Sequence, residues 1–364
     1  MKKMKLVALF LSLAMIIGLT ACGGSDTPDT SKDPGTQSSA PAEEGNQPAN
    51  DGKVYNLRMS CEASEGQWLA VMLQDYADDV AEATNGQVQI ELYLGNSLGA
   101  AGDIWSMFTQ GAIDMVHCGV AHAGHFPVTN IVQTPFVVSS PECAEAVMVA
   151  LMEKGMLTEF TDNMHVVAFM PTLMQQFMFV DKEIKSVEDL SGMIIRASST
   201  PLMTAVESLG STATSIPITD LYMSLSQGVA DGTITSVDAA DIFKLQDVCK
   251  YLLDMPISTG MNFVGINLQT WNSLPADIQE AMDKVGAEYQ QKYLELNTQA
   301  GQDCLASMTS GGCTVLTASD ELVAACKDAT SGMVDQLIAD LNAEGLDGAA
   351  IVTAAQEAIA AFEG

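Results

Sequence analysis

Arginine is scarce in this chain, and one of its two copies lies where a cation could bind a ligand. Lys and Arg together number 15 of 364 residues, and only Arg58 and Arg196 are Arg. Arg196 ends the apolar run 193–195 and precedes the small polar segment 197–200, which suits the start of a helix. This pattern predicts a guanidinium at the carboxyl end of a strand, the edge of a parallel sheet where ligands bind. Its planar fork of donors matches a carboxylate.

The pattern alone leaves two roles open for Arg196: binding an anionic ligand, or forming a structural salt bridge with one of the 46 Asp and Glu residues. Arg58 lies in the middle of 54–60, opposite the apolar positions, so we expect a solvated strand residue. His117, His122 and His125 lie within nine residues. Because this segment has the pattern of strand and loop, without a helical i, i+4 pair, we favour packing or pocket lining over a metal site.

Composition narrows the class of function. A formal net charge of -31 argues against nucleic acid, which requires a basic surface, and against direct adsorption to an anionic membrane. The sequence has no nucleophile elbow, phosphate-binding loop or HExxH motif, and therefore no recognisable catalytic set. We expect a protein that is not an enzyme and that needs neither a cofactor nor a metal.

The cysteines also argue against a metal site. No CxxC pair occurs, and seven Cys follow position 22: Cys61, Cys118, Cys143, Cys249, Cys304, Cys313 and Cys326. Because seven is an odd number, at least one thiol is free unless it pairs between chains. We expect most of them to be small buried hydrophobes, with a Cys304–Cys313 bridge as an open alternative.

The elements that must position Arg196 follow from hydrophobic periodicity. Strand patterns at 54–60, 87–93 and 113–118 alternate with helical spacing at 66–84 and 101–110. This β-α-β-α-β order predicts a parallel sheet covered by helices.

The same order restarts later in the chain and predicts a second lobe. The expected strands are 164–169, 177–180, 193–196 and 232–236, with a capped turn at 186–190 and helices near 201–209 and 218–227. From about 274 onward the pattern is almost purely helical, over 276–308, 319–342 and 349–362. The predicted fold is α/β, with two lobes, a ligand cleft between them and long C-terminal helices.

The N-terminus has the pattern of an export signal. Three Lys precede an apolar stretch too short to span a membrane, and Leu19-Thr20-Ala21-Cys22 follows. This tetrapeptide resembles the bacterial lipobox, in which the Cys is lipidated after cleavage. We therefore expect residues 1–22 to be a lipoprotein signal with Cys22 acylated. Residues 23–52, rich in Pro, Gly and Ser, are expected to be a disordered tether.

Several motifs resemble one family, the TRAP (tripartite ATP-independent periplasmic) solute-binding proteins of the DctP type. The strongest are IKSVEDLSGMIIR at 184–196 and IPITDLY at 216–222, followed by QGVADG at 227–232. Weaker matches lie at 93–99, 110–115, 134–136 and 271–275. They occur in the family's order over about residues 54 to 300.

The resemblance implies a two-lobed receptor that closes around a small organic anion. Arg196 matches the family Arg that grips the ligand carboxylate. A second family Arg falls at Gln176 and a family Asn at Thr235, so this chain lacks two groups that other members use on acidic ligands. Ile218 in the second lobe, and Glu62 and Gly119 in the first, match further pocket positions.

The lobes implied by the resemblance are 53–173 with 262–300, and 174–261 with 301–364. The expected partners are a small organic acid, the TRAP membrane subunits of an ion-driven importer and, through the lipid anchor, the outer face of the cell membrane. We expect a monomer located outside the cytoplasm. The alternative is a ligand-binding lipoprotein that acts as co-receptor for a membrane sensor, and an extracellular enzyme is a third possibility.

Overall fold

The computed structural model describes residues 52–121, 123 and 125–364, which form a nine-stranded mixed sheet with helices. The strands are β1 (Tyr55–Cys61), β2 (Val88–Tyr93), β3 (Met115–Gly119), β4 (Met164–Phe179), β5 (Ile194–Arg196), β6 (Thr212–Thr214), β7 (Gly232–Thr235), β8 (Tyr251–Asn267) and β9 (Thr314–Thr317). Their order across the sheet is β2-β1-β3-β8-β4-β7-β5-β6, and β9 pairs with β8 outside this path.

Thirteen α-helices and two short 3-10 turns connect the strands within the described part of the chain. They are α1 (Trp68–Ala83), α2 (Ala101–Thr109), α3 (Asn130–Gln133), α4 (Pro141–Glu153), α5 (Thr158–Thr161), η1 (Val187–Leu190), α6 (Thr200–Ser208), α7 (Ile218–Ser226), α8 (Val237–Ile242), η2 (Leu245–Asp247), α9 (Leu268–Trp271), α10 (Ala276–Ser310), α11 (Asp320–Thr330), α12 (Met333–Ala343) and α13 (Gly348–Glu363). The expected lipid site Cys22, the signal 1–22 and all but the last residue of the tether lie outside the described residues.

The first βαβαβ unit confirms the predicted parallel pairing. β1 lies between β2 and β3 and is parallel to both. Side chains alternate between the two faces of the sheet: in β3, Val116 and Cys118 belong to one buried cluster and Met115 to another. We call the part of the molecule around β1–β3 the first lobe and the part around β5–β7 the second lobe.

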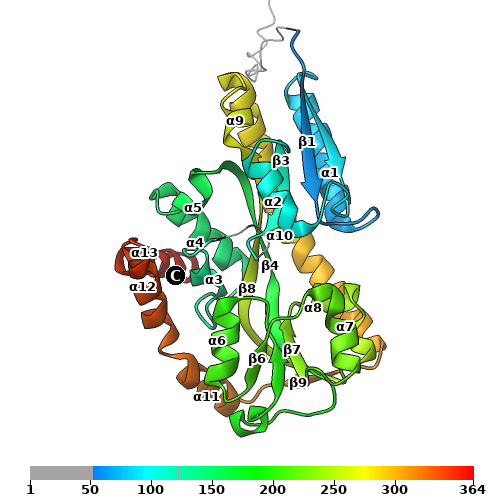
Figure 1. The fold of residues 1–364 in the computed structure, drawn as a ribbon, viewed down its shortest axis with the longest axis vertical. Helices are drawn as coiled ribbons and strands as arrows, with labels where there is room; N and C mark the ends of the chain where they lie inside the picture. Colours follow the sequence, from blue (N-terminus) through cyan, green and yellow to red (C-terminus); the bar gives the residue numbers. More distant parts are fainter. Residues whose placement is uncertain (1–51, 122, 124) are drawn as a thin grey trace, which may run out of the picture. The chain divides into compact units, whose positions relative to one another are not determined.

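Two long antiparallel strands, β4 and β8, run through both lobes (Figure 1). β3 pairs with residues 262–266 of β8 in the first lobe, whereas β7 pairs with residues 176–179 of β4 in the second. The β4–β8 register shifts at three places, between Val166 and Ala168, between Pro171 and Met174, and between Gln175 and Phe177. The last two lie where the two strands cross from one lobe to the other.

The central pair is the main departure from the sequence-based expectation. The segments 164–169 and 177–180 were predicted as separate strands, but 164–179 is one strand. β8, β6 and β9 were not predicted, and neither was α4. In β8 the interruptions at Pro256 and Gly260 hide a 17-residue strand whose partners are distant in sequence.

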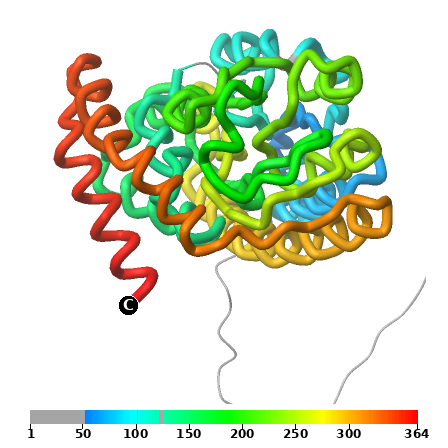
Figure 2. The backbone as a smooth tube through the Cα atoms, turned by 90° about the horizontal axis from the view of Figure 1, so that it is seen from below, coloured from blue at the N-terminus to red at the C-terminus, as the bar shows by residue number. Residues whose placement is uncertain are grey.

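The C-terminal helices contact both lobes, and the last of them, red in Figure 2, lie along one side of the described structure. The buried side chains of α10 join a first-lobe cluster from Ile278 to Leu294 and a second-lobe cluster at Met308. The predicted single helix 319–342 is broken near Gly332 into α11 and α12. α11 packs in the second lobe, whereas α13 packs on α4 and shares the first-lobe core. The lobe boundaries stay a prediction, and these contacts favour placing 333–364 with the first lobe.

The described cysteines are free thiols, and all except the half-buried Cys304 are buried. The structure thus contains no Cys304–Cys313 bridge. Burial raises the pKa of the Cys61 and Cys249 thiols to about 12, so both stay protonated and behave as apolar groups.

Candidate functional site

Arg196, Thr235 and Gln176 lie together at one edge of the second-lobe sheet. Arg196 is the last residue of β5 and Thr235 is the last residue of β7. These strands are parallel, and Arg196 pairs with Thr233, two residues before Thr235. On the other side of β7, Thr235 pairs with Gln176 of β4. Three of the predicted site residues are therefore brought together.

The environment of Arg196 leaves most of its hydrogen-bonding capacity unused. The residue is 6% exposed, and its Nε donates to the carbonyl oxygen of Ile216 over 2.9 Å. Within the described residues it forms no ion pair, and burial lowers its pKa to about 10. The guanidinium is thus protonated at neutral pH, and its two terminal nitrogens remain available. The structural salt bridge that the sequence left open has no acid partner here.

Two neighbouring groups were not identified from the sequence. Gln175 and Gln176 are adjacent on β4, and the Oε1 atom of each is buried without a hydrogen-bond partner among the described residues. Ser199, three residues after Arg196, occupies the N-cap position of α6, and its Oγ atom is also buried without a hydrogen-bond partner among the described residues. Two adjacent Gln in a mostly apolar strand were the available signal for Gln175.

Ile218 belongs to the second lobe and is close in sequence to Ile216, the hydrogen-bond partner of Arg196. It is the first residue of α7, half-buried, and packs against the second-lobe cluster of Leu221 and Leu225. It follows Ile216, whose carbonyl orients Arg196, by two residues.

Glu62 and Gly119 occupy the equivalent edge of the first lobe. Glu62 directly follows β1, and Gly119 ends β3, where it pairs with Asn262 of β8. Burial lowers the pKa of His117, which lies opposite Cys61 in the sheet and is therefore neutral at pH 7. Burial raises the pKa of Cys118, and a hydrogen bond with Glu62 adds to that rise.

A pocket of about 210 Å³ lies between the two strand edges. Its first-lobe wall starts at Val120, directly after Gly119, and its second-lobe wall is residues 198–200, directly after Ala197. Because the carboxyl ends of β3 and β5 both reach it, the pocket lies where the fold places ligands.

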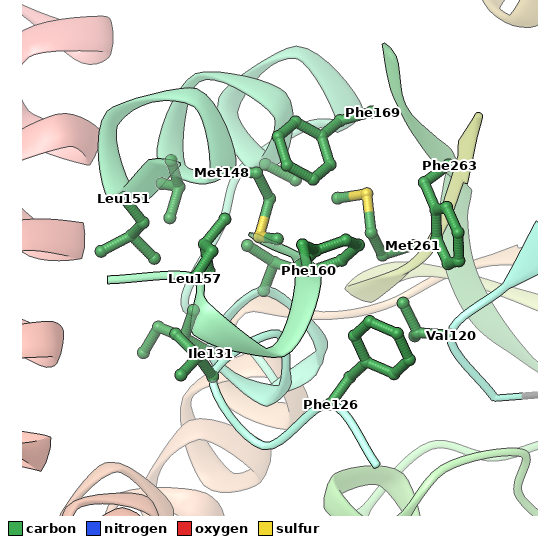
Figure 3. Packing of buried hydrophobic residues seen from close by; sticks show 14 of the residues in the cluster. Val120, Phe126, Ile131, Met148, Leu151, Leu157, Phe160, Phe169, Met261 and Phe263 are labelled. Carbon is green, nitrogen blue, oxygen red and sulfur yellow. The ribbon is translucent and has the colours of Figure 1, made fainter. Parts of the chain in front are cut away.

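Aromatic packing holds the first-lobe wall in place. Phe126 lies with its ring centroid 4.7 Å from that of Phe160 and 5.8 Å from that of Phe263. Figure 3 shows Val120 and Phe126 directed into this cluster, beside Met261. Glu159 also accepts hydrogen bonds from the backbone N–H groups of Val128 and Thr129.

The histidines have different surroundings. His125 lines the pocket, is exposed, and has its Nε2 atom 2.5 Å from a carboxylate oxygen of Glu344, whereas His117 is buried. His122 lies outside the described residues. Among the residues that are described, no three His, Cys, Asp or Glu side chains are arranged to hold a metal ion.

Comparison with known proteins identifies the family. The family described as bacterial extracellular solute-binding protein, family 7 (DctP), matches residues 59–340. The chain belongs to this family. Its members are TRAP solute-binding proteins, which bind small acid ligands outside the cytoplasm and work with membrane transporter subunits.

Individual family members are distant relatives of this chain. A solute-binding protein of Albidiferax ferrireducens is 25% identical over 72% of this chain and 79% of its own. The C4-dicarboxylate-binding periplasmic protein DctP of Rhodobacter capsulatus is 23% identical over 76% and 85%. A marine metagenome TRAP solute binding protein specific for aromatic acid ligands, crystallised with 3-hydroxybenzoate, has a TM-score of 0.78 at 22% identity, covering 86% of this chain and 100% of that one.

The structural likeness confirms the predicted α/β fold with two lobes. In the described part of this family 7 protein, no helix has the length and apolar character required to cross a membrane.

Proposed function

We propose that this family 7 protein captures a small organic acid by its carboxylate and delivers it to a TRAP-type, ion-driven importer. One observation supports this most directly: Arg196 is buried and protonated, has no acid partner among the described residues, and ends a strand two residues before the pocket wall at Ser198. A buried charge is costly unless it is paired, so the bound carboxylate is the expected counter-charge.

The geometry suits bidentate binding. The Nε of Arg196 is held by the Ile216 carbonyl, which orients the guanidinium plane and leaves Nη1 and Nη2 for the two carboxylate oxygens. Gln176, Thr235 and Ile218 would complete the second-lobe side, with Glu62 and Gly119 on the first-lobe side. Closure of the lobes would then shield the pair from water, which strengthens it.

The names of relatives support an acid ligand without identifying it. One relative is named for C4-dicarboxylates, and a solved neighbour is specific for aromatic acid ligands. The co-receptor alternative has no such support among them. We further propose that the chain is a monomeric lipoprotein anchored through Cys22 to the outer face of the cell membrane.

A thermal-shift screen of mono- and dicarboxylates, followed by calorimetric titration of each hit, tests the function. We expect at least one acid to raise the melting temperature and to bind with one-to-one stoichiometry, since a ligand that binds only the folded state stabilises it. Incubation with that acid should leave it chemically unchanged. Turnover of the acid, or saturable binding of neutral solutes with no binding of any acid, would contradict the proposal.

A further inference from the structure

Side chains replace regular strand pairing at the point where β4 and β8 cross between the lobes. The register shift after Pro171 leaves β4 with one residue more than β8, which is a β-bulge. There Thr259 Oγ1 donates to the carbonyl oxygen of Thr172 over 2.7 Å, and Thr172 Oγ1 accepts from the Gly260 N–H over 2.9 Å. The crossing is therefore held by hydroxyl groups of these two threonines in addition to the backbone.

The carbonyl oxygen of Pro171 is bound by two side chains of the long helix α10. The Tyr293 hydroxyl donates to it over 2.9 Å, and the Asn297 Nδ2 atom donates to it over 3.2 Å. The Met170 carbonyl oxygen lies farther from the same hydroxyl, at 3.4 Å. Tyr293 is 3% exposed and Asn297 is 2% exposed. Because a buried hydrogen bond is costly to leave unmade, the two donors fix β4 against α10 at Pro171.

This attachment lies where α10 itself passes from one lobe to the other. The buried side chains of α10 belong to the first-lobe cluster as far as Leu294, and Met308 belongs to a second-lobe cluster. Tyr293 is at the border of the first cluster, and Asn297 lies between the two clusters. A rotation of one lobe relative to the other must therefore move β4 and α10 close to the carbonyl that joins them.

We infer that the Pro171 carbonyl is the pivot of the lobe motion, and that Tyr293 and Asn297 are positioning residues for ligand capture. The capture step rests on the proposed function, whereas the pivot does not. Both side chains lie outside the lining of the pocket of about 210 Å³, so they act through the position of the lobes.

Loss of the pivot should weaken binding by an entropic route. Without the two donors, residues 171–173 sample more backbone conformations while the lobes are open, and closure must order them. A smaller fraction of the protein is then ready to close, and the apparent affinity falls by that fraction.

Two tyrosines one turn apart on α10 provide a matched pair of variants. Tyr293→Phe removes the hydroxyl at the crossing and keeps the ring. Tyr289→Phe is the control, because Tyr289 is 5% exposed and its hydroxyl donates over 2.6 Å to Asp79 of α1, within the first lobe. Asn297→Ala removes the other donor to Pro171 and serves as a second variant at the crossing.

Hydrogen exchange followed by mass spectrometry tests the pivot without any ligand. In Tyr293→Phe and Asn297→Ala, we expect amides of 170–175 and 258–262 to exchange about tenfold faster than in wild type, because local opening becomes easier. The same amides in Tyr289→Phe should exchange as in wild type. Unchanged exchange at the crossing in Tyr293→Phe would overturn the inference.

Calorimetric titration with benzoate, succinate and pyroglutamate tests the positioning role. For each of these acids that binds the wild type, Tyr293→Phe should bind about three- to tenfold more weakly, since fewer molecules are ready to close. Tyr289→Phe should bind like wild type, even where its melting temperature falls as far. Wild-type affinity in Tyr293→Phe would make Tyr293 a structural residue only and would overturn the inference. Absence of binding by every acid of the thermal-shift screen would contradict the proposed function, and hydrogen exchange would still decide on the pivot.

Discussion

At the scale of single residues, Arg196 combines burial with an incomplete set of partners. One hydrogen bond to Ile216 fixes its orientation, and the described residues offer it no acid although the chain has 46 Asp and Glu. Arg58 shows the opposite condition: it is exposed and pairs with Asp114. The two arginines therefore form a natural comparison between a site residue and a surface residue.

Substitutions at Arg196 and Gln176 should weaken ligand binding in an order set by the charge and shape of the new side chain. Arg196→Ala leaves the bound carboxylate buried and unpaired. This should cost about 3–5 kcal/mol of binding free energy, which is a loss in affinity of about two to three powers of ten or more. Arg196→Lys should lose somewhat less, because an ammonium keeps the charge but not the fork. Gln176→Ala should weaken binding by about 1 kcal/mol, because that is the net contribution of a neutral hydrogen bond.

Calorimetric titration of each folded variant with the acid found by screening measures this order. Arg58→Ala is the control and should bind like wild type, since Arg58 is a solvated residue of β1. Binding of Arg196→Ala within about threefold of wild type, less than 1 kcal/mol, would make Arg196 a structural residue.

Affinity for the acid should be nearly constant from about pH 6 to 9 and fall above about pH 10. Burial lowers the pKa of Arg196 to about 10, so the free protein loses the required cation above that pH. The unfolded chain keeps its proton up to the ordinary value of 12.5, so between these values the unfolded state binds more protons. This group's contribution to the free energy of unfolding therefore rises with pH over that window.

Titrations at several pH values, with circular dichroism to confirm folding at each, measure the profile. A fall in affinity between pH 7 and 9 would show that a group other than Arg196 controls binding.

At the scale of elements, the long helix α10 approaches β4 closely at two glycines. A methyl group at Gly286 would lie 2.8 Å from Val167 Cγ1 and 3.1 Å from the Val167 carbonyl oxygen. At Gly301 it would meet the tip of the Leu173 side chain at 2.8 Å. The first neighbour includes backbone and cannot move readily, whereas the second is the far end of a flexible side chain.

Gly286→Ala should therefore destabilise the protein more than Gly301→Ala. Overpacking costs about 1–3 kcal/mol, against about 1 kcal/mol gained in helix propensity. We expect the free energy of unfolding to fall in Gly286→Ala and to change little in Gly301→Ala. Urea unfolding measures both, with Gly102→Ala in α2 as a control that meets no atom within 4 Å. A Gly286→Ala variant as stable as the control would show that α10 can move away from β4.

At the scale of the whole described structure, several segments cross between the lobes: β4, β8, α10 and the α11–α12 connection. Two of the three register shifts in the β4–β8 pairing lie between Pro171 and Phe177, at this crossing. These crossings are the places where a hinge motion would be accommodated.

Ligand binding should lower the radius of gyration in solution by a small amount, because hinge closure moves lobes without unfolding them. Small-angle scattering with and without a saturating acid measures this. An inert carboxylate that fails to raise the melting temperature is the control. Superimposable curves in the presence of a verified ligand would contradict closure.

Cys22→Ala should abolish lipid attachment, because the thiol carries the diacylglyceryl group. We expect unprocessed or released protein in place of acylated membrane protein. Mass spectrometry of the membrane fraction measures the outcome, with Cys304→Ala as a control that keeps the lipobox. Acylated membrane protein in the Cys22 variant would contradict the lipoprotein assignment.

The sequence by itself determined many of the local elements and the position of Arg196 at a strand end. Periodicity located β1, β2 and β3 to within a residue or two, and their alternation with helices predicted parallel pairing. The run before Arg196 placed it at a strand end, where it lies. These features are encoded locally, because side-chain spacing reflects the geometry of one element and the polarity of its faces.

Only the tertiary structure decided what those elements contact. β8 pairs with β3, β4 and β9, which are distant in sequence, so its pattern is neither purely alternating nor bounded by clear turns. The packing of α13 on α4, and the absence of an acid partner for Arg196 among residues 52–121, 123 and 125–364, were likewise decided by contacts between distant segments. Amphipathic periodicity shows that a face is buried without specifying its partner, and a charge count cannot tell which of 46 acids comes within reach. Those outcomes depend on long-range packing.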